Sequence, residues 1–502
     1  MTVLLLDNHA AEVKVTARVQ RDGRLLIGHE WREATSGRRF EVTDPATGAV
    51  VGSTPDADES DVRSAIDAAH DALPMWRVTP AIERARLLRR SADFIRERRE
   101  LIANVMTDEQ GKPLAESAGE VDYAAGFLEW FAGEAERIYG QVAPPSSPEK
   151  RVLVLRQPVG VTTAITPWNF PAAMLTRKLG PAIAAGCTSV VKPASATPLT
   201  AIEICRAIRD AGAPPGLVNL ITTRQSAMAV DVLMGDPRVR KISFTGSTEV
   251  GKDLIRRSAD QVKRLSLELG GHAPFIVFDD ADLGAALEQL MASKFRNAGQ
   301  TCVCANRIYV QRGVYREFLE AFAARTAALV VGVGSRPGVQ IGPLIDERAL
   351  AKVEQHVEDA VRHGARVVVG GRRIHEGDLA TGHFFAPTVL DGVTGDMLIA
   401  REETFGPVAG LTAFDTEDEA VRLANDTPYG LAAYFATRDY ARLLRVAERL
   451  EFGVVGANDG LPSTPSAPFG GMKESGFGRE GGAFGIEEYL DVKYVSIGGI
   501  GS

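Results

Sequence analysis

The stretch from Val161 to Leu269 constrains the fold most, because short apolar runs alternate there with longer segments of helical periodicity. Strands are predicted at 161–166, 188–192, 217–222, 241–246 and 264–269, with helices starting near Pro171, Pro198, Ser226 and Ser247. Strands that alternate with helices in this way form a parallel sheet with helices on both faces. The segment therefore predicts a doubly wound α/β domain of the dinucleotide-binding type.

A second alternating region follows and predicts a further α/β lobe. Its strands are expected at 276–278, 308–310, 366–369 and 453–455. We assign residues 1–144 and 161–267 to a Rossmann-like cofactor-binding domain and residues 268–480 to a catalytic domain.

Two segments outside these domains predict an extended arm. A proline-rich break at 143–148 precedes residues 151–157, which alternate like an exposed strand. Residues 489–497 alternate as an edge strand and are expected to pair with the 151–157 strand of a neighbouring subunit. We therefore expect 145–160 and 481–502 to form an oligomerisation arm with a C-terminal strand, in a homodimer or homotetramer.

The composition excludes several classes of protein. Of the 502 residues, 45% are hydrophobic and 24% are charged, which supports large cores and excludes a disordered chain. A formal net charge of -8 argues against nucleic acid or an anionic membrane as a partner. No apolar run is long enough to span a bilayer, and the apolar 3–6 segment lacks a basic flank, so we expect a cytoplasmic location. The four cysteines form no CxxC motif or zinc-type cluster, and we expect no metal.

Cys302 is the candidate nucleophile. It follows Gly299-Gln300-Thr301, a small-residue turn that exposes a sulfur and leaves a backbone N–H free. Most free cysteines are buried and inert, but this chain also offers a carboxylate, Glu268, after an apolar run and an amide, Asn169. A thiol, a carboxylate and an amide are the groups that acyl chemistry through a thioester requires.

The segment 244–252 ends a predicted strand and opens a helix, so its free N–H groups predict a phosphate-binding site. It nearly matches the P-loop of nucleotide hydrolases, but Asp253 stands where the magnesium-binding Ser or Thr is required. An ordinary capped helix is the alternative, and the usual GxGxxG fingerprint is absent.

Seven motifs together resemble the aldehyde dehydrogenase superfamily, over about Leu26 to Tyr494. In chain order they are TPWNFP (166–171), VKPAS (191–195), FTGSTEVG (244–251), ELGG (268–271), GQTC (299–302), EETFGP (402–407) and PFGGMKESGFGRE (468–480). The resemblance is nearest to the succinate-semialdehyde dehydrogenase branch. It implies an aldehyde dehydrogenase-like α/β fold and a nicotinamide cofactor, NADP or NAD.

The same resemblance implies a set of cofactor-binding residues: Thr166, Pro167, Trp168, Lys192, Ser195, Arg224, Gly246, Ser247, Leu269, Glu403 and Phe405. Lys192 would bond the adenosine ribose, Ser247 the pyrophosphate and Glu403 the nicotinamide ribose. Ser195 stands where many NAD-dependent relatives carry glutamate, and a carboxylate there would repel a 2′-phosphate. Serine therefore favours NADP, and Arg224 is expected either to pair with the 2′-phosphate or to crowd the adenine.

The resemblance also implies a mechanism. Cys302 would attack the aldehyde carbon to give a thiohemiacetal, with the oxyanion held by the Asn169 amide and the Cys302 N–H. Hydride transfer to the nicotinamide would leave a thioester, which Glu268 would hydrolyse by activating water.

For the substrate, Arg177, Arg296 and Ser463 match residues that hold a carboxylate in that branch, so we expect an anionic aldehyde, succinate semialdehyde first. Pro462 and Pro465 depart from the branch pattern, and glutarate, 2-oxoglutarate or sulfonate-bearing semialdehydes are the alternatives. A non-catalytic structural member of the fold is a further alternative.

Cys304 lies two residues after the nucleophile. In an extended loop the two sulfurs would point the same way and could form a strained redox-sensitive disulfide, as in the resembling branch. A buried packing thiol is the alternative.

Overall fold

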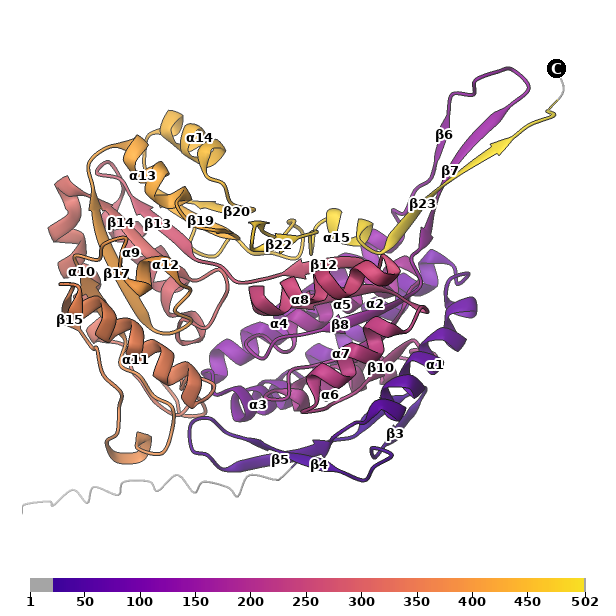
Figure 1. Ribbon diagram of the computed structural model, residues 1–502, viewed down its shortest axis with the longest axis horizontal. Coiled ribbons are helices and arrows are strands. Elements are labelled where there is room, and N and C mark those ends of the chain that lie inside the picture. The colour runs from indigo at the N-terminus through magenta and orange to yellow at the C-terminus, as the bar shows by residue number, and fades with distance from the viewer. Residues whose placement is uncertain (1–20, 501–502) are drawn as a thin grey trace, which may run out of the picture.

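The computed structural model describes residues 21–500, which form two α/β lobes and a projecting arm (Figure 1). The first twenty residues of the predicted 1–144 range and the last two of 481–502, with the apolar 3–6 segment, lie outside the described residues. Within the described part of the chain, no helix combines the length and apolar character needed to cross a membrane.

The first lobe contains the parallel strands that the alternating sequence predicts. Across this sheet the order is β22 (Gly476–Phe477), β12 (Arg264–Glu268), β11 (Val239–Thr245), β8 (Val161–Ile165), β9 (Thr188–Lys192), β10 (Val218–Leu220), β2 (Leu25–Ile27) and β3 (Glu30–Arg32). The five central strands, from β12 to β10, run parallel. The chain order turns at β8, with β9 and β10 on one side and β11 and β12 on the other. The crevice beyond the carboxyl ends of β8 and β11 is therefore the topological switch point, where such sheets bind ligands.

Helices cover both faces of this sheet, as strands buried on both sides require. They are α1 (Glu59–Trp76), α2 (Ala81–Glu97), α3 (Arg99–Gln110), α4 (Leu114–Ala135), α5 (Ala173–Ala185), α6 (Pro198–Asp210), α7 (Ser226–Gly235) and α8 (Thr248–Ser258). Successive residues of β9 enter different cores: Val190 packs with α1 and α7, whereas Val191 packs with α2 to α6. The helix α4, which lies in the second layer on α5, reaches the active-site end of the sheet.

The second lobe repeats the parallel pattern. Its sheet has the order β15 (Arg366–Val369), β16 (Thr388–Asp391), β17 (Val408–Phe414), β14 (Ala305–Gln311), β13 (Ala273–Val277), β19 (Ala432–Ala436) and β20 (Val454–Ala457), with only β15 antiparallel among these strands. Its helices are α9 (Leu283–Phe295), α10 (Tyr315–Ala327), α11 (Glu347–Arg362), α12 (Leu398–Arg401), α13 (Glu417–Asn425) and α14 (Tyr440–Arg449). The predicted strands at 308–310, 366–369 and 453–455 are each found, with boundaries shifted by a few residues at most.

One boundary differs from the sequence-based assignment of 268–480 to the catalytic domain. The strand β22 falls inside that range but pairs with β12 of the first sheet, and α15 (Phe484–Glu487) follows it onto the same lobe. Two small sheets complete the described elements: β1 (Arg21–Asp22), β5 (Val50–Pro55) and β4 (Arg39–Thr43), and β18 (Tyr429–Gly430) with β21 (Met472–Lys473).

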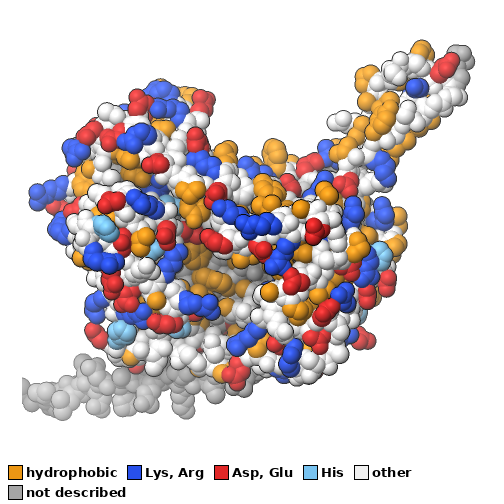
Figure 2. All heavy atoms as spheres, in the orientation of Figure 1, with side chains coloured by type: hydrophobic (Ala, Val, Ile, Leu, Met, Phe, Trp, Pro, Cys, Tyr) orange, Lys and Arg blue, Asp and Glu red, His pale blue; other side chains and the backbone are white. Residues whose placement is uncertain are grey.

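The arm is a three-stranded sheet of β6 (Gln141–Ala143), β7 (Arg151–Pro158) and β23 (Leu490–Ile497), with β7 in the middle. The expectation that the C-terminal strand pairs with a neighbouring subunit is wrong, because β23 pairs with β7 of its own chain along all eight residues. The chain returns to the base of the arm through α15, which places β23 beside β7. Hydrophobic side chains show on the arm in Figure 2, and Val142, Val492 and Tyr494 are exposed there.

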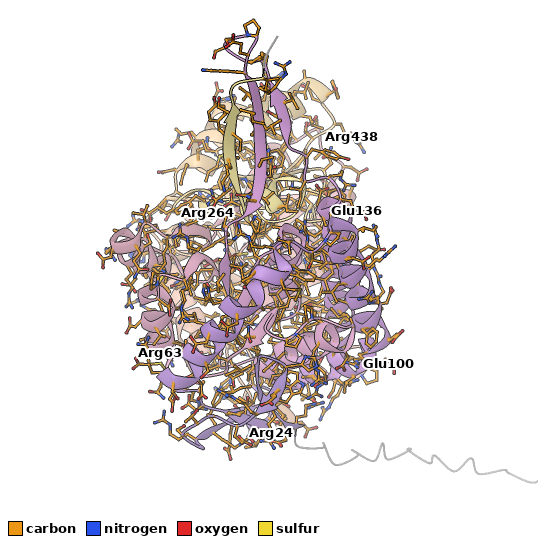
Figure 3. All side chains as sticks on the ribbon, turned by 90° about the vertical axis from the view of Figure 1, so that its right-hand side faces the viewer. Arg24, Arg63, Glu100, Glu136, Arg264 and Arg438 are labelled. Atoms are coloured by element: carbon orange, nitrogen blue, oxygen red, sulfur yellow. The ribbon has the colours of Figure 1, made fainter. Side chains whose placement is uncertain are left out.

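Figure 3 faces the arm, with Arg264 labelled near its base. Arg264 at the start of β12 donates to the Leu490 carbonyl oxygen at 2.7 Å and pairs with Asp491 at 3.2 Å. These contacts fix the first residues of β23 to the edge of the first lobe.

Candidate active site

A cavity of about 320 Å³ lies between the two lobes, where Figure 2 shows a hollow with hydrophobic side chains in it. It is bounded by the carboxyl ends of β8 and β11, the start of α8 and the turn that carries Cys302. Of the residues that the sequence singles out, the cavity is lined by Pro167, Trp168, Asn169, Arg177, Gly246, Ser247, Leu269, Arg296, Cys302, Glu403, Phe405 and Ser463. Segments far apart in the chain therefore meet at the topological switch point of the first sheet.

The turn that carries Cys302 begins with three consecutive left-handed residues: Asn297, Ala298 and Gly299 have φ values of 51°, 55° and 75°. Left-handed backbone at two non-glycine residues is strained and persists only when neighbours hold it. Asn297 is held on three sides: its N–H donates to Glu116 at 2.8 Å, its Oδ1 accepts from Gln110 at 3.0 Å, and its Nδ2 donates to the Asn169 carbonyl oxygen at 3.1 Å. This strained turn thus places Cys302 next to the Asn169 loop.

Cys302 is half-buried at the cavity wall. Burial raises the pKa of its thiol to about 12, and the Glu403 carboxylate adds to this, whereas the Arg177 guanidinium opposes it. The resting side chain is therefore a thiol at neutral pH. Its conversion to the nucleophilic thiolate needs a proton acceptor or added positive charge in the cavity.

Glu268, the last residue of β12, is a suitable proton acceptor. Its side chain is buried, and neither carboxylate oxygen has a hydrogen-bond partner among residues 21–500. Burial raises its pKa well above the usual range, and the neighbouring Glu480 carboxylate adds to the shift, while Lys178 and Arg177 oppose it. A buried carboxyl group with both oxygens free can take up a proton near neutral pH and can bind a water molecule.

Asn169 follows β8 and is buried beside the cysteine turn. Its Nδ2 donates to the Gln300 carbonyl oxygen at 3.0 Å, which leaves the second amide proton free. Its main-chain carbonyl oxygen accepts from the Lys112 ammonium at 2.6 Å. Asn169 is therefore held through both its side chain and its main chain.

At the opposite wall, the guanidinium of Arg177 lies buried under aromatic rings. Its Cζ is 4.2 Å from the ring centre of Phe469 and 4.8 Å from that of Phe127. The Nη2 atom donates to the Tyr123 hydroxyl at 2.7 Å, but Nε and Nη1 have no hydrogen-bond partner in the described chain. The Glu480 carboxylate lies 3.8 Å from Nε, too far for a hydrogen bond.

Two further predicted residues complete this wall. Ser463 Oγ lies 2.6 Å from the Tyr123 hydroxyl. Arg296 ends α9 and is half-buried, with its guanidinium 4.7 Å from the ring centre of Phe170. Two cationic side chains and two hydroxyl groups thus gather at one end of the cavity, which suits an anionic ligand.

The other end of the cavity fits a dinucleotide. The N-terminus of α8 faces it through Gly246 and Ser247, and helix N-termini bind phosphate. A Cβ atom at Gly246 would lie 2.3 Å from the Phe244 ring, so any other residue there would require that ring to move. Glu403 accepts from the Gly271 N–H at 3.1 Å and still has an oxygen to offer a ribose hydroxyl, and burial raises its pKa to about 7. Phe405, with a left-handed φ of 56°, completes this wall.

Three of the remaining predicted cofactor residues lie outside the cavity wall, beyond the carboxyl ends of β9 and β10. Lys192 is buried at the end of β9, donates to the Pro193 carbonyl oxygen at 3.2 Å, and has a pKa lowered to about 8 by burial. Ser195 is half-buried in the turn after β9, and Arg224 is exposed after β10. Ser195 and Arg224 thus follow the carboxyl ends of the parallel neighbours β9 and β10. The Arg224 guanidinium lies 5.4 Å from the ring centre of Phe40 and donates to the Glu41 carbonyl oxygen at 3.2 Å. Thr166 is buried between β8 and the cavity.

Cys304 does not have the extended geometry that the sequence suggests. Residues 301–303 form a turn, closed by a hydrogen bond from the Cys304 N–H to the Thr301 carbonyl oxygen at 3.1 Å. The Cys304 side chain is buried and its sulfur donates to the Lys294 carbonyl oxygen at 3.2 Å, and both Cys302 and Cys304 are free thiols. A disulfide between them would require this turn to open.

Sequence reasoning missed several residues of the site. Tyr123, Phe170, Met174, Lys352 and Phe469 also line the cavity, and Lys112 and Glu120 support it from behind. Phe170 and Phe469 stand inside the motifs TPWNFP and PFGGMKESGFGRE, so proximity to those motifs could have found them. Tyr123 lies in the middle of α4 and carries no local signal. No group of three or more potential metal ligands occurs together within residues 21–500.

The comparisons with known proteins agree with this geometry. Residues 31–495 match the aldehyde dehydrogenase family. The chain is 54% identical to an NADP(+) succinate-semialdehyde dehydrogenase of Escherichia coli (strain K12), over 94% of this chain and 97% of that protein. It is 53% identical to a glutarate-semialdehyde dehydrogenase of Pseudomonas putida, over 94% and 97% of the two chains. It is 52% identical to a 3-sulfolactaldehyde dehydrogenase of Pseudomonas putida, over 94% and 96%.

A solved structure of a succinate-semialdehyde dehydrogenase from Burkholderia pseudomallei is 50% identical and superposes with a TM-score of 0.92, over 95% of this chain and 98% of that one. Relatives named for three different aldehydes thus stand at nearly equal identity, and the solved structure shares the architecture described above. On the strength of the match over residues 31–495, this chain belongs to the aldehyde dehydrogenase family.

Proposed function

We propose that this chain oxidises an aldehyde with a terminal anionic group to the corresponding carboxylic acid, with NADP or NAD as the hydride acceptor. Succinate semialdehyde is the first candidate substrate, and glutarate, 2-oxoglutarate and sulfonate-bearing semialdehydes are the alternatives. The observation that carries the proposal is the buried guanidinium of Arg177, which keeps two nitrogens unpartnered in the cavity that Cys302 also lines. A buried cation with free donors is costly unless an anion completes it.

The side chains of the cavity suit an acyl transfer to water. The Cys302 thiol proton passes to Glu268 and from there to solvent, and the sulfur bonds to the aldehyde carbon. The free proton of the Asn169 amide and the Cys302 N–H stabilise the resulting oxyanion. Each such donor contributes about 3 kcal/mol in comparable sites. When bound, the nicotinamide cofactor accepts hydride from the substrate carbon. Cys302 then holds the acyl group as a thioester.

Glu268 completes the reaction as the base. Its raised pKa allows it to take a proton from the attacking water, and its unpartnered oxygens can accept a hydrogen bond from that water. Hydrolysis releases the carboxylic acid and restores the Cys302 thiol. A scaffold without activity would need neither a reactive cysteine nor an unsatisfied buried carboxyl.

The cofactor preference is inferred from the residues that follow β9 and β10, where the adenosine ribose of the cofactor is expected to bind. Ser195 presents a hydroxyl after β9, and no carboxylate side chain occupies position 195. Arg224 adds a cation after β10, where its guanidinium lies over Phe40. No carboxylate at position 195 repels a 2′-phosphate, so we expect the enzyme to prefer NADP to NAD. The E. coli relative that is named for NADP(+) supports this choice.

The decisive experiment is a kinetic panel of aldehydes of matched length, with a carboxylate, a sulfonate or no charge at the far end, each with NADP and NAD. We expect the anionic aldehydes to have the higher kcat/KM. Cys302→Ala should abolish turnover but still bind NADPH, seen by its fluorescence. Equal turnover of the uncharged aldehydes would contradict the anionic substrate, and activity in Cys302→Ala would contradict the nucleophile.

The proposal includes assembly into a homo-oligomer in the cytoplasm. The arm is a β-sheet with exposed apolar side chains, which suit burial against another copy of this chain. Light scattering coupled to size exclusion should give a mass that is a multiple of the chain mass, and a monomer would contradict it.

A further inference from the structure

The end of the cavity that holds Arg177 and Arg296 contains a residue to which no role has been given. Tyr123 of α4 lines the cavity between Arg177 and Ser463. Its ring packs edge-on against Phe127, with the ring centres 4.8 Å apart. The phenol oxygen is thus held at a fixed point between the two polar side chains.

The protons of this cluster can be counted from the donors. A guanidinium only donates, so the Tyr123 oxygen accepts from Arg177 Nη2 at 2.7 Å. The single proton of Tyr123 is then available to Ser463 Oγ, 2.6 Å away. When Ser463 accepts that proton, its own hydroxyl proton is free to point into the cavity. The chain of hydrogen bonds from Arg177 through Tyr123 to Ser463 therefore ends in a hydroxyl that can donate to a ligand.

We propose that Tyr123 is the positioning residue for recognition of the terminal anion: it holds Arg177 in place and makes the Ser463 hydroxyl a donor to the substrate. This inference rests on the proposed function, because it requires an anionic aldehyde. Without the phenol, no donor would orient the Ser463 hydroxyl toward the ligand, and Arg177 Nη2 would be left without its hydrogen-bond acceptor. Recognition of the anion would then weaken, while the reacting end of the cavity, at Cys302 and Asn169, would keep its own contacts.

The matched substitution is Tyr123→Phe, which keeps the ring against Phe127 and removes only the hydroxyl. With succinate semialdehyde, we expect kcat/KM to fall by roughly tenfold to a hundredfold, mainly through a higher KM, because a hydrogen bond in a chain that reaches a charged group is lost. With butanal, which has the same carbon chain but no charge, kcat/KM should stay nearly the same. Selectivity between the two aldehydes is therefore the readout.

Two further variants separate positioning from general damage. Tyr434→Phe also removes a buried phenol near the site, one that donates to the Val303 carbonyl oxygen at 2.7 Å, but within residues 21–500 no hydrogen bond joins this phenol to Arg177, Tyr123 or Ser463. We expect it to change both aldehydes by the same factor. Ser463→Ala should lower the selectivity for succinate semialdehyde over butanal, as Tyr123→Phe does. The double variant should lose little more selectivity than Ser463→Ala alone, because the phenol acts largely through that serine.

The outcomes also distinguish this inference from the proposed function. If the unmodified enzyme does not prefer succinate semialdehyde to butanal, the anionic substrate itself is wrong. If it does prefer succinate semialdehyde but Tyr123→Phe changes both aldehydes equally, Tyr123 is packing and the inference is overturned. Fully additive losses in the double variant would likewise overturn the action through Ser463.

Discussion

Lys112 donates a hydrogen bond to the main-chain carbonyl oxygen of Asn169 at 2.6 Å, across 57 positions of the chain. The same ammonium pairs with Glu120 at 2.5 Å, and both side chains are fully buried. Glu120 in turn accepts from the N–H groups of Ala172 and Ala173 at the start of α5. A buried ion pair thus clamps the loop whose amide serves the oxyanion.

Lys112→Met should therefore cost both stability and catalysis. It leaves the Glu120 carboxylate buried without its cation, which destabilises a protein by about 3 to 5 kcal/mol. Release of the Asn169 carbonyl oxygen should also lower kcat more than it raises KM. Urea unfolding and steady-state kinetics measure the two effects. The exposed pair of Arg99 with Asp122 also joins α3 to α4, and Arg99→Ala should cost about 1 kcal/mol or less.

The raised pKa of Glu268 predicts a pH dependence of turnover. The base works only when ionised, so kcat should rise with pH until Glu268 has lost its proton, which its raised pKa places at a higher pH than for an ordinary glutamate. Glu268→Gln should give one burst of reduced cofactor and then stall at the thioester, with no such rise. Stopped-flow absorbance at the reduced-nicotinamide band records the burst. Steady turnover by the variant at the parent rate would exclude Glu268 as the base.

The same shift predicts a pH dependence of stability. Because the folded-state pKa of Glu268 lies above its unfolded value, the folded protein holds the proton more tightly, and stability falls as pH rises from the unfolded pKa through the folded one. Glu268→Gln carries no ionisable group there. The Tm of the variant minus the Tm of the parent should therefore increase as pH rises from 5 to 9. A Tm difference that is independent of pH would contradict the raised pKa of Glu268.

Ser195→Glu tests whether position 195 faces the adenosine ribose of the cofactor. A carboxylate in the turn after β9 should repel the 2′-phosphate, so the KM for NADP should rise much more than the KM for NAD. Ser195→Ala, which adds no charge, is the control and should change the ratio little. Equal responses of the two cofactors to the glutamate would mean that position 195 does not face the ribose.

The buried Cys304 and the raised pKa of Cys302 predict how the enzyme responds to peroxide. We expect mild peroxide to inactivate it at a rate that rises with pH, because the thiolate reacts and its pKa is about 12, and we expect dithiothreitol to restore activity. Peptide mass mapping then decides the role of Cys304. A linked Cys302–Cys304 peptide indicates that the turn at 301–303 opens, and only Cys302 oxyacids would leave Cys304 as packing, with Cys304→Ala behaving like the parent.

Much of this architecture could be predicted because strand and helix periods are local. The apolar run at 188–192 has clear ends and predicts β9 with the bounds that the structure has. Tyr123 and Lys112 could not be predicted, because their roles arise only when α4 packs on α5 and brings them beside residues far away in sequence. The left-handed backbone at Asn297 and Ala298 was equally hidden, since neither residue type signals it. The partner of β23 was misassigned because alternation identifies an edge strand but not its neighbour.

The pairing of β23 with β7 has a practical consequence for handling the protein. The eight-residue strand β23 is the last element of the described chain and covers one edge of β7, whose other edge is covered only in part by the three-residue β6. A nonsense codon or proteolytic clip just before Leu490 would uncover a row of main-chain amides flanked by apolar side chains, which is a template for sheet-to-sheet aggregation. An affinity tag is therefore better fused to the amino terminus, and a chain shortened at its carboxyl end should precipitate before it loses its fold.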